Sequence, residues 1–167
     1  SKIEHHMSLL TTDLCDANPD KVNVALPIGL KHYGGNSMFN GTIHTVKCHE
    51  DNSLVRTALE GDGTGKVLVV DGGGSLRCAL LGDMLGELAV KNKWNGVIVY
   101  GCIRDSVAMG KLPLGVMALA TIPLKSNKRN EGQENMALHF AGISFVPGHV
   151  LYADEDGIIT SAAALTL

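Results

Sequence analysis

Two uninterrupted apolar runs, with a longer amphipathic stretch between them, dominate the hydrophobic pattern of the chain. Residues 66–71 read KVLVVD and residues 96–101 read GVIVYG. Short apolar runs without alternation are typical of parallel strands that are buried on both faces, and such strands need a long crossover connection. The stretch 75–93 would supply that connection. The pattern therefore predicts a parallel βαβ unit at the centre of a mixed α/β fold.

Further elements are expected on both sides of this unit. Residues 41–48 alternate apolar and polar side chains and predict a half-buried strand, whereas 52–60 has helical spacing. We also expect a polar-capped helix start at 11–17, a strand at 114–120, an exposed polar loop at 125–134, and late strands at 141–146 and 150–160. These elements predict one domain over residues 7–167. Residues 1–6 have an atypical composition and are expected to be a remnant of expression outside the domain.

Gly82 and Gly86 interrupt the stretch 75–93. Each would cost about 1 kcal/mol relative to alanine inside a helix, so we do not expect one continuous helix. A break at Gly82 would leave a short turn or helix over 75–81 and a second helix that Asp83 caps. The second helix is expected to bury Leu85, Leu88 and Ala89. The amides of residues 84–86 would then form a natural site for a carboxylate or phosphate. The alternative is that Gly82 is a tight connection and Asp83 only a cap.

Arg104 and Asp105 follow the second apolar run closely, within the segment YGCIRD. Ligands of open parallel sheets collect beyond the carboxyl ends of the strands, where the loops leaving Val70 and Tyr100 should lie side by side. Arg104 suits a planar carboxylate, and the carboxylates of Asp105 and Asp83 suit Mg²⁺ or Mn²⁺, directly or through waters. The alternative is an Arg104–Asp105 pair that neutralises itself at the end of a strand.

Composition and charge exclude several classes of function. The chain has 14 basic and 17 acidic residues in 167, and its lysines and arginines do not lie along one stripe, which argues against direct nucleic-acid binding. No apolar run approaches the roughly 18–20 residues of a membrane span, and we expect a cytoplasmic protein with no membrane contact. The four cysteines contain no CxxC pair and are expected to be reduced. The 20 glycines include DGGGS at 71–75 and GDGTGK at 61–66, but neither completes a nucleotide-binding motif.

Several sequence blocks together resemble the RraA-like family, which includes the regulator of ribonuclease activity A and class II 4-hydroxy-4-methyl-2-oxoglutarate aldolases. The blocks are TTDLCDA at 11–17, GG at 34–35, GTIHTVKCHEDN at 41–52, GKVLVVDGGGSLRCALLGD at 65–83, WNGVIVYGCIRD at 94–105 and LYADEDGII at 151–159. The resemblance implies a compact α/β domain of the swivelling β/β/α type. It also implies a ring-shaped homotrimer with clefts between subunits.

The aldolase branch implies roles for individual residues. Arg104 matches its substrate-binding arginine, Asp105 its metal ligand, and Asp83 a carboxylate that holds a water ligand of the metal. The segment that binds the substrate carboxylate through backbone amides corresponds to Gly82, Asp83, Met84 and Leu85. Arg104 and Asp83 are thus the expected catalytic residues, and Mg²⁺ or Mn²⁺ the expected cofactor.

The implied activity is that of a lyase acting on a small pyruvoyl acid. It would cleave 4-hydroxy-4-methyl-2-oxoglutarate to two pyruvates and decarboxylate oxaloacetate through the same pyruvate enolate. The alternative is a non-catalytic regulator that binds an RNA-degrading enzyme and inhibits ribonuclease E activity. Asp105 favours the aldolase, because ribonuclease-regulating members can lack this acid.

The chain departs from the aldolase pattern in two places. Ala108 stands where the resemblance leads us to expect Glu or Asp, and the sequence ends at Leu167 without the extension through which longer aldolases lend a carboxylate to a neighbouring site. We therefore expect weak metal affinity and slow turnover.

Overall fold

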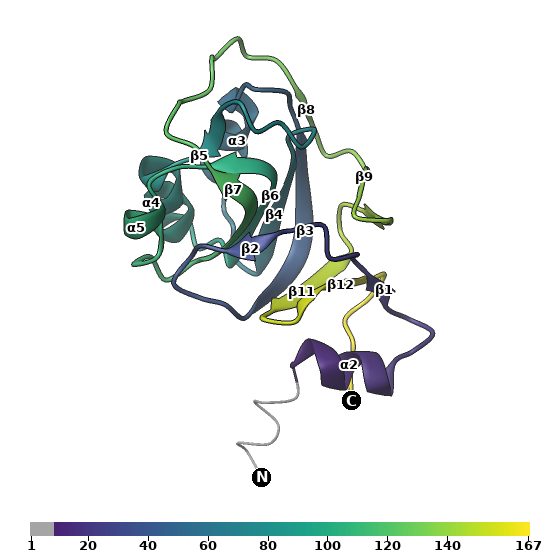
Figure 1. Cartoon of the computed structure of the whole chain (residues 1–167). Helices are drawn as coiled ribbons and strands as arrows, with labels where there is room; N and C mark the ends of the chain where they lie inside the picture. The colour runs from purple at the N-terminus through teal and green to yellow at the C-terminus, as the bar shows by residue number, and fades with distance from the viewer. Residues whose placement is uncertain (1–8) are drawn as a thin grey trace.

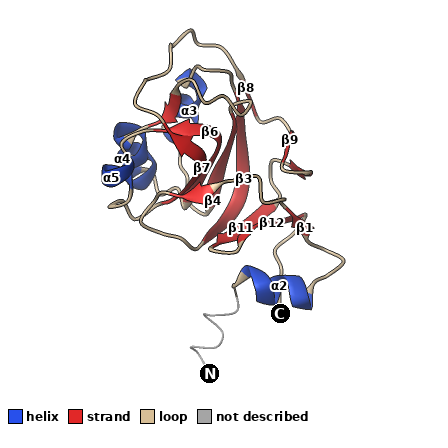
Figure 2. Ribbon diagram, viewed as in Figure 1, coloured by secondary structure: helices blue, strands red, loops and turns tan. Residues whose placement is uncertain are grey.

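A computed structural model describes residues 9–167 as one α/β domain built around a large mixed sheet (Figures 1 and 2). The strands are β1 (Asn23–Val24), β2 (Lys31–His32), β3 (Phe39–Lys47), β4 (Lys66–Asp71), β5 (Ala79–Leu81), β6 (Gly96–Ile103), β7 (Gly115–Thr121), β8 (Gln133–Glu134), β9 (Leu138–Phe140), β10 (Ile143–Phe145), β11 (Val150–Asp154) and β12 (Gly157–Ser161). The helices are α2 (Thr11–Ala17), α3 (Ser53–Leu59), α4 (Asp83–Lys91) and α5 (Ser106–Met109).

Four parallel strands in the order β3-β4-β6-β7 form the centre of the sheet, and antiparallel strands extend both sides. The order along the sheet is β1-β12-β11-β3-β4-β6-β7-β2, with β5 paired to β6 and β8 to β3. Strands β4 and β6 pair in parallel from Val67 opposite Gly96 to Asp71 opposite Tyr100. The predicted parallel βαβ unit is therefore confirmed.

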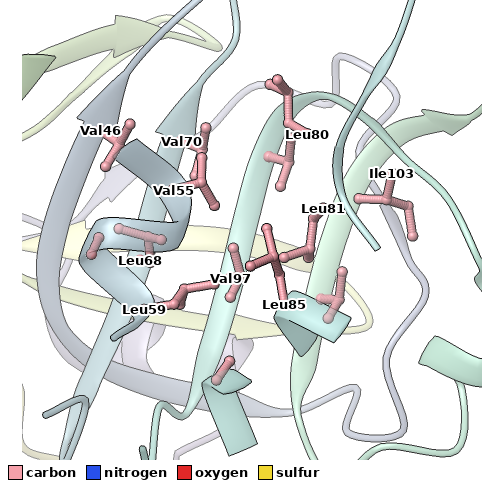
Figure 3. Close-up of a cluster of buried hydrophobic side chains, with 14 of the residues drawn as sticks. Val46, Val55, Leu59, Leu68, Val70, Leu80, Leu81, Leu85, Val97 and Ile103 are labelled. Atoms are coloured by element: carbon pink, nitrogen blue, oxygen red, sulfur yellow. The ribbon is translucent and has the colours of Figure 1, made fainter. Parts of the chain in front are cut away.

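Both faces of the central strands are buried, as their continuous apolar sequence requires. Along β4, Leu68 and Val70 face a core that α3 and α4 cover, and Figure 3 shows Val70 beside Val55 of α3 and Leu85 of α4 beside Val97 of β6. The intervening residues of β4 face a second core, which contains β9, β10, β11 and β12. The alternation along one strand thus divides the apolar side chains between two cores.

Three local predictions need correction. Residues 75–81 do not form the predicted short turn or helix. They form a loop followed by the strand β5, because pairing with β6 supplies backbone hydrogen bonds to residues 79–81. The expected strand at 141–146 is part of a hairpin, β9–β10, that turns at Ala141 and Gly142. Helix α2 is not capped by a polar side chain at its N-cap, because that residue is Leu10; Asp154 of β11 accepts a hydrogen bond from the Thr11 amide at 2.7 Å instead.

Other expectations are confirmed for the part of the chain that the structure describes. All four cysteines are free, and Cys48, Cys78 and Cys102 are buried. The segment 125–134 is largely an exposed loop that ends in β8. None of the helices within 9–167 has both the length and the apolarity that a membrane crossing requires.

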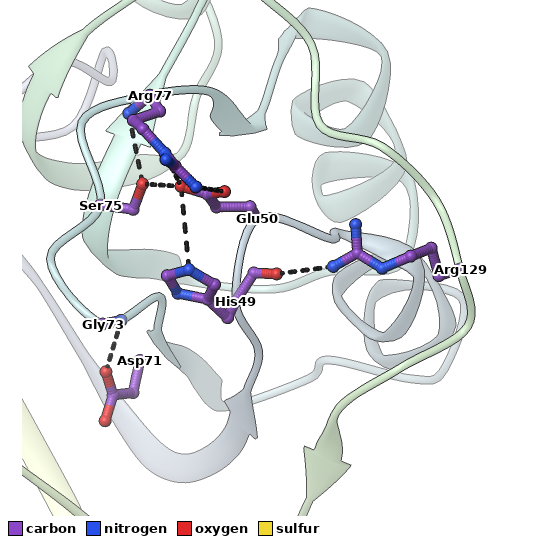
Figure 4. A network of polar contacts seen from close by, with 7 residues as sticks. All are labelled: His49, Glu50, Asp71, Gly73, Ser75, Arg77 and Arg129. Carbon is purple, nitrogen blue, oxygen red and sulfur yellow. Dashed lines mark hydrogen bonds and ion pairs between the residues drawn. The ribbon is translucent and has the colours of Figure 1, made fainter.

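A polar network fixes the loop that precedes β5 (Figure 4). Arg77 donates two hydrogen bonds to the Glu50 carboxylate, from Nε at 2.6 Å and from its terminal nitrogen at 2.5 Å. Ser75 donates a third at 2.6 Å. These bonds lower the pKa of Glu50 to about 2 and keep it ionised. The network therefore anchors residues 75–77 to the end of β3.

A buried carboxylate, Asp51, holds the loop 125–131 against the start of α3. It accepts hydrogen bonds from the Ser53 amide and hydroxyl at 2.9 and 2.6 Å, and from the amides of Arg129 and Glu131 at 2.7 and 3.1 Å. Burial opposes the ionisation of Asp51, but these hydrogen bonds outweigh it and lower the pKa from 3.8 to about 2.

We predict that Asp51→Asn destabilises the fold by about 3 kcal/mol at pH 7, because an amide nitrogen cannot accept two of these bonds. Asp62→Asn is the matched control, because exposed Asp62 accepts analogous bonds from Thr64; it should cost less than about 1 kcal/mol. Urea denaturation followed by circular dichroism measures both.

The effect of Asp51 should also depend on pH in a defined direction. Because its pKa is lower in the folded chain, its stabilisation is present above about pH 4 and is lost as the pH falls toward 2. The stability difference between wild type and Asp51→Asn should therefore shrink across this interval. A constant difference, or equal stability of the Asp51 and Asp62 variants, would contradict this role.

Candidate active site

The pairing of β5 with the end of β6 brings the predicted site residues together. Ala79 lies opposite Cys102 and Leu81 opposite Ile103, in parallel register. The Arg104 amide then donates to the Leu81 carbonyl at 2.9 Å. Gly82 and Arg104, which leave these two strands, must therefore emerge side by side.

The position of the site relative to the strand ends differs from the prediction. The loop leaving β4 does neighbour Tyr100, since the Gly72 amide donates to the Tyr100 carbonyl at 3.0 Å. However, β6 continues through the bulged region near Tyr100 to Ile103, because β5 provides a further pairing partner. Gly101, the last residue of the second apolar run, is consequently buried inside β6. The site lies beyond it, at the ends of β5 and β6.

Helix α4 begins as predicted, but Gly82 is its N-cap and Asp83 its first residue, and no side-chain cap is formed. The Gly86 amide is already used, because it donates to the Gly82 carbonyl at 2.9 Å. The Asp83 amide donates to Oδ2 of Asp105 at 3.0 Å. Within residues 9–167, the amides of Met84 and Leu85 have no hydrogen-bond acceptor. The free amides at this helix end are therefore those of residues 84 and 85, rather than 84–86.

Asp105 has a backbone conformation that few residues other than glycine adopt. Its φ of 57° and ψ of 45° lie in the left-handed region, which aspartate tolerates better than most side chains. In this conformation the Asp105 carboxylate accepts a hydrogen bond from the backbone amide of Asp83. That hydrogen bond, a contact with the Asp83 side chain and the charge of Arg104 together lower the pKa of Asp105 despite some desolvation. Asp105 is therefore an anion at neutral pH.

Arg104 and Asp105 do not neutralise each other through a close ion pair. Nε of Arg104 is 4.0 Å from Oδ2 of Asp105, which is too long for a hydrogen bond, and the side chains are 40% and 39% exposed. No acceptor within residues 9–167 takes a hydrogen bond from the Arg104 guanidinium. The guanidinium of Arg104 is consequently available to bind the carboxylate of a ligand. This disfavours the alternative in which Arg104 and Asp105 only neutralise each other.

The close approach of these side chains leaves little room for a side chain at Gly82. A Cβ atom at this position would lie 2.8 Å from Oδ2 of Asp105 and 3.3 Å from Nε of Arg104. The backbone φ of −127° is open to any residue, so the constraint is steric rather than conformational.

The site residues border a cavity of about 120 Å³. One part of its lining is formed by the predicted residues Gly82, Asp83, Met84, Leu85, Arg104 and Asp105. The other part was not predicted and comprises Asn52, Arg56, Ala79, Lys125, Ser126 and Lys128. The sequence KSNKR at 125–129 contains three basic residues in five positions and was the signal available for this second part.

A second, more open cavity lies on the other side of the two aspartates. Asp83 and Asp105 line it together with Ala108 of α5 and Glu87 of α4. The carboxylate expected at position 108 is thus absent from this lining, whereas Glu87 contributes one from the facing helix.

The donor set fits a metal with few protein ligands. No group of three or more His, Cys, Asp and Glu side chains within residues 9–167 is arranged around a common metal position. However, the Asp83 and Asp105 side chains are in contact, and Asp105 is ionised. Mg²⁺ commonly uses one or two carboxylates and takes its remaining ligands from water and substrate. Asp83 and Asp105 are therefore suited to such an ion.

Comparison with known proteins places this chain in a family. The model for "RraA-like: Aldolase/RraA" matches residues 11–160. A protein of Aromatoleum aromaticum named "Putative 4-hydroxy-4-methyl-2-oxoglutarate aldolase" is 58% identical over 159 residues, which cover 95% of this chain and 99% of the relative.

Two solved structures share the fold closely. One is described as an S-adenosylmethionine: 2-dimethylmenaquinone methyltransferase from Geobacillus kaustophilus; its TM-score is 0.91 at 47% identity, covering 93% of this chain and 96% of that one. The other is the RNA-processing inhibitor RraA from Thermus thermophilus, with a TM-score of 0.90 at 43% identity and 94% coverage of both chains. With a family model that matches nearly the whole domain and relatives of this similarity, the chain belongs to the RraA-like family.

Proposed function

We propose that this protein is a divalent-metal-dependent lyase that cleaves 4-hydroxy-4-methyl-2-oxoglutarate to two pyruvates and also decarboxylates oxaloacetate. The observation that carries the proposal is the convergence of three features in one cavity. These are the uncommitted guanidinium of Arg104, the free amides of Met84 and Leu85, and the paired carboxylates of Asp83 and Asp105. The name of the Aromatoleum aromaticum relative supports this choice.

The cavity favours an anionic substrate over the cofactor named for the Geobacillus kaustophilus structure. S-adenosylmethionine brings a positively charged sulfonium and a purine ring, which aromatic or apolar surfaces and acidic groups would recognise. This cavity contains no aromatic side chain, and its four cationic side chains, those of Arg56, Arg104, Lys125 and Lys128, outnumber the carboxylates of Asp83 and Asp105. Its chemistry therefore suits a carboxylate.

Each residue has a distinct task in the proposed reaction. Arg104 binds the carboxylate next to the keto group through charge-assisted hydrogen bonds, and the amides of Met84 and Leu85 support it at the positive end of α4. Mg²⁺ or Mn²⁺, held by Asp105 and through waters by Asp83, would supply a Lewis acid that stabilises developing negative charge.

The bond that breaks is C3–C4 of the substrate, and its electrons move into the pyruvate enolate. The Asp83 carboxylate accepts the proton of the C4 hydroxyl, so that C4 becomes the keto carbon of one pyruvate. Protonation of the enolate at C3 gives the second pyruvate. Oxaloacetate follows the same route, except that its C4 carboxylate leaves as CO₂ and no hydroxyl proton is removed.

The similarity to the RNA-processing inhibitor of Thermus thermophilus supports a second candidate, a regulator that binds an RNA-degrading enzyme. This function would use the outer surface and needs neither Arg104 nor Asp105 to react. The two candidates are distinguished by the activity of purified protein.

The first prediction from this proposal is pyruvate release from both substrates with Mg²⁺, and its loss with EDTA. Arg104→Ala should lower kcat/KM by roughly 10- to 100-fold, because hydrogen bonds to a charged partner are lost, and Arg104→Lys should restore part of it. Asp105→Asn, which keeps a side chain tolerant of the left-handed backbone, should lose activity while thermal stability changes little.

Coupled assay with lactate dehydrogenase measures the pyruvate. Activity that persists in EDTA, or unchanged activity of Asp105→Asn, would exclude this mechanism. No turnover together with capture of a ribonuclease or helicase of the RNA-degradation machinery would favour the regulator instead.

The second prediction concerns the steric role of Gly82. Gly82→Ala should displace Asp105 or Arg104 and lower kcat/KM at least tenfold, with little change in thermal stability, because the backbone accepts alanine. Gly101→Ala is the matched control: its Cβ would meet only ordinary contacts, the nearest at 3.4 Å from Leu80. Equal activity of the two variants would contradict the proposed packing at Gly82.

The third prediction is a homotrimer whose interface includes the face around the site. Met84 and Val107 flank the two aspartates and are 73% and 76% exposed, which is unusual for large apolar side chains. Light scattering should give three times the 17.6 kDa chain mass. Val107→Glu should lower that mass, and a monomeric wild type would refute the assembly.

A further inference from the structure

Three basic side chains in the candidate active-site cavity have no side-chain partner within residues 9–167. Arg56 comes from α3, and Lys125 and Lys128 come from the loop after β7. No ion pair or side-chain hydrogen bond within residues 9–167 involves any of them. Two nearby arginines behave differently, because Arg77 pairs with Glu50 and Arg129 with Glu131. The three free cations are therefore a local feature of the cavity lining.

The charge of the cavity differs in sign from the charge of the chain. Four cationic side chains and two carboxylates line it, whereas the chain as a whole carries a net charge of −3. A metal at Asp83 and Asp105 would make the cavity more positive still. Arg104 and the helix amides can satisfy one carboxylate, which leaves the remaining cations for a second anionic group.

Backbone contacts fix the positions from which these cations extend. Lys125 lies in a parallel β-bridge with Ala79 of β5, and the Ala79 amide donates to the Leu124 carbonyl at 2.8 Å. Ser126 is buried and donates to Oδ1 of Asn52 at 2.8 Å while accepting from the Asn52 amide at 3.2 Å. The loop therefore begins beside the strand that leads to Gly82.

Asn52, which forms hydrogen bonds with Ser126, also contacts Arg56. The Arg56 amide donates to the Asn52 carbonyl at 3.1 Å, so the two residues lie one helical turn apart on one face of α3. Both line the cavity. The free cations thus enter the lining of the cavity from two segments, α3 and the loop after β7, neither of which carries Arg104.

We infer that Arg56, Lys125 and Lys128 form a second carboxylate subsite, which binds the distal carboxylate of a dicarboxylic 2-oxo acid. This inference rests on the proposed function, because it takes the Arg104 side as the place of the keto-acid end. It adds the residues that recognise the distal carboxylate and so assigns the part of the site that distinguishes dicarboxylic acids from monocarboxylic ones.

The subsite affects the two proposed reactions differently. In the aldol cleavage, the distal carboxylate is retained on the departing pyruvate, so cations that bind it act equally on substrate and transition state and lower KM. In the decarboxylation of oxaloacetate, that carboxylate loses its charge as CO₂ forms. Cations that hold it then favour the ground state and oppose the reaction.

Binding of unreactive 2-oxo acids tests the subsite without turnover. 2-Oxoglutarate and 2-oxopentanoate have the same five-carbon chain, but only the former has a distal carboxylate, and neither has the C4 hydroxyl that cleavage requires. Calorimetry with Mg²⁺ present should give wild-type binding that is at least tenfold tighter for 2-oxoglutarate. In Lys125→Met/Lys128→Met, and in Arg56→Met, this preference should fall below threefold.

Lys21→Met/Lys91→Met is the matched control, because it removes two exposed positive charges from outside the cavity. It should keep the preference, which separates a local subsite from the general charge of the protein. In turnover, the Lys125/Lys128 variant should show a KM for 4-hydroxy-4-methyl-2-oxoglutarate raised at least tenfold, with oxaloacetate kcat unchanged or increased.

The outcomes for the subsite and for the lyase function are distinguishable. If the preference exists in wild type and disappears in the cavity variants while no acid is cleaved, the subsite stands and the lyase fails. If both acids are cleaved but the cavity variants keep the wild-type preference, the subsite is refuted and the lyase stands. Equal wild-type affinity for the two probes would also overturn the subsite.

Discussion

The parallel pairing of β5 with the carboxyl end of β6 is the interaction on which the candidate site depends. A three-residue strand contributes few backbone hydrogen bonds, yet its register decides which residues meet where the two strands end. Gly82 then begins α4 directly beside Arg104, and Asp105 reaches the first amide of that helix. A shift of one residue would turn the side chains of a strand to its other face and separate these groups.

Two groups of polar contacts hold the segments on either side of β5. The Glu50–Arg77 network holds the preceding loop, and Asp51 and Asn52 hold the loop that carries Lys125 and Lys128. The carboxylates of Glu50 and Asp51 follow the end of β3, so one short segment positions both the strand that forms the site and its cationic lining. Because the hydrogen bonds of Asp51 are buried, they are little screened by solvent and can keep the exposed loop in one place.

The RraA-like fold carries proteins with different names, and the structure suggests how one scaffold accommodates them. The charged groups of the proposed lyase lie on loops and helix ends beyond the sheet, where substitutions do not disturb either core. In this chain, Asp105 is present and Glu87 faces the position of Ala108 across a cavity.

The sequence by itself determined the central βαβ unit, because continuous apolar runs at 66–71 and 96–101 can be buried only between two layers. It also pointed to Gly82, Asp83, Arg104 and Asp105, because a glycine break before a helix and a charged strand end are local signals. It did not predict β5, whose three residues form a strand only because β6 offers them a partner. Nor did it place Arg56, Lys125 and Lys128 in the site, because their approach to Arg104 depends on contacts between segments far apart in the chain. Only the tertiary structure could decide that part, since hydrogen bonds such as those of Asp51 with Arg129 and Glu131 join residues that no local pattern relates.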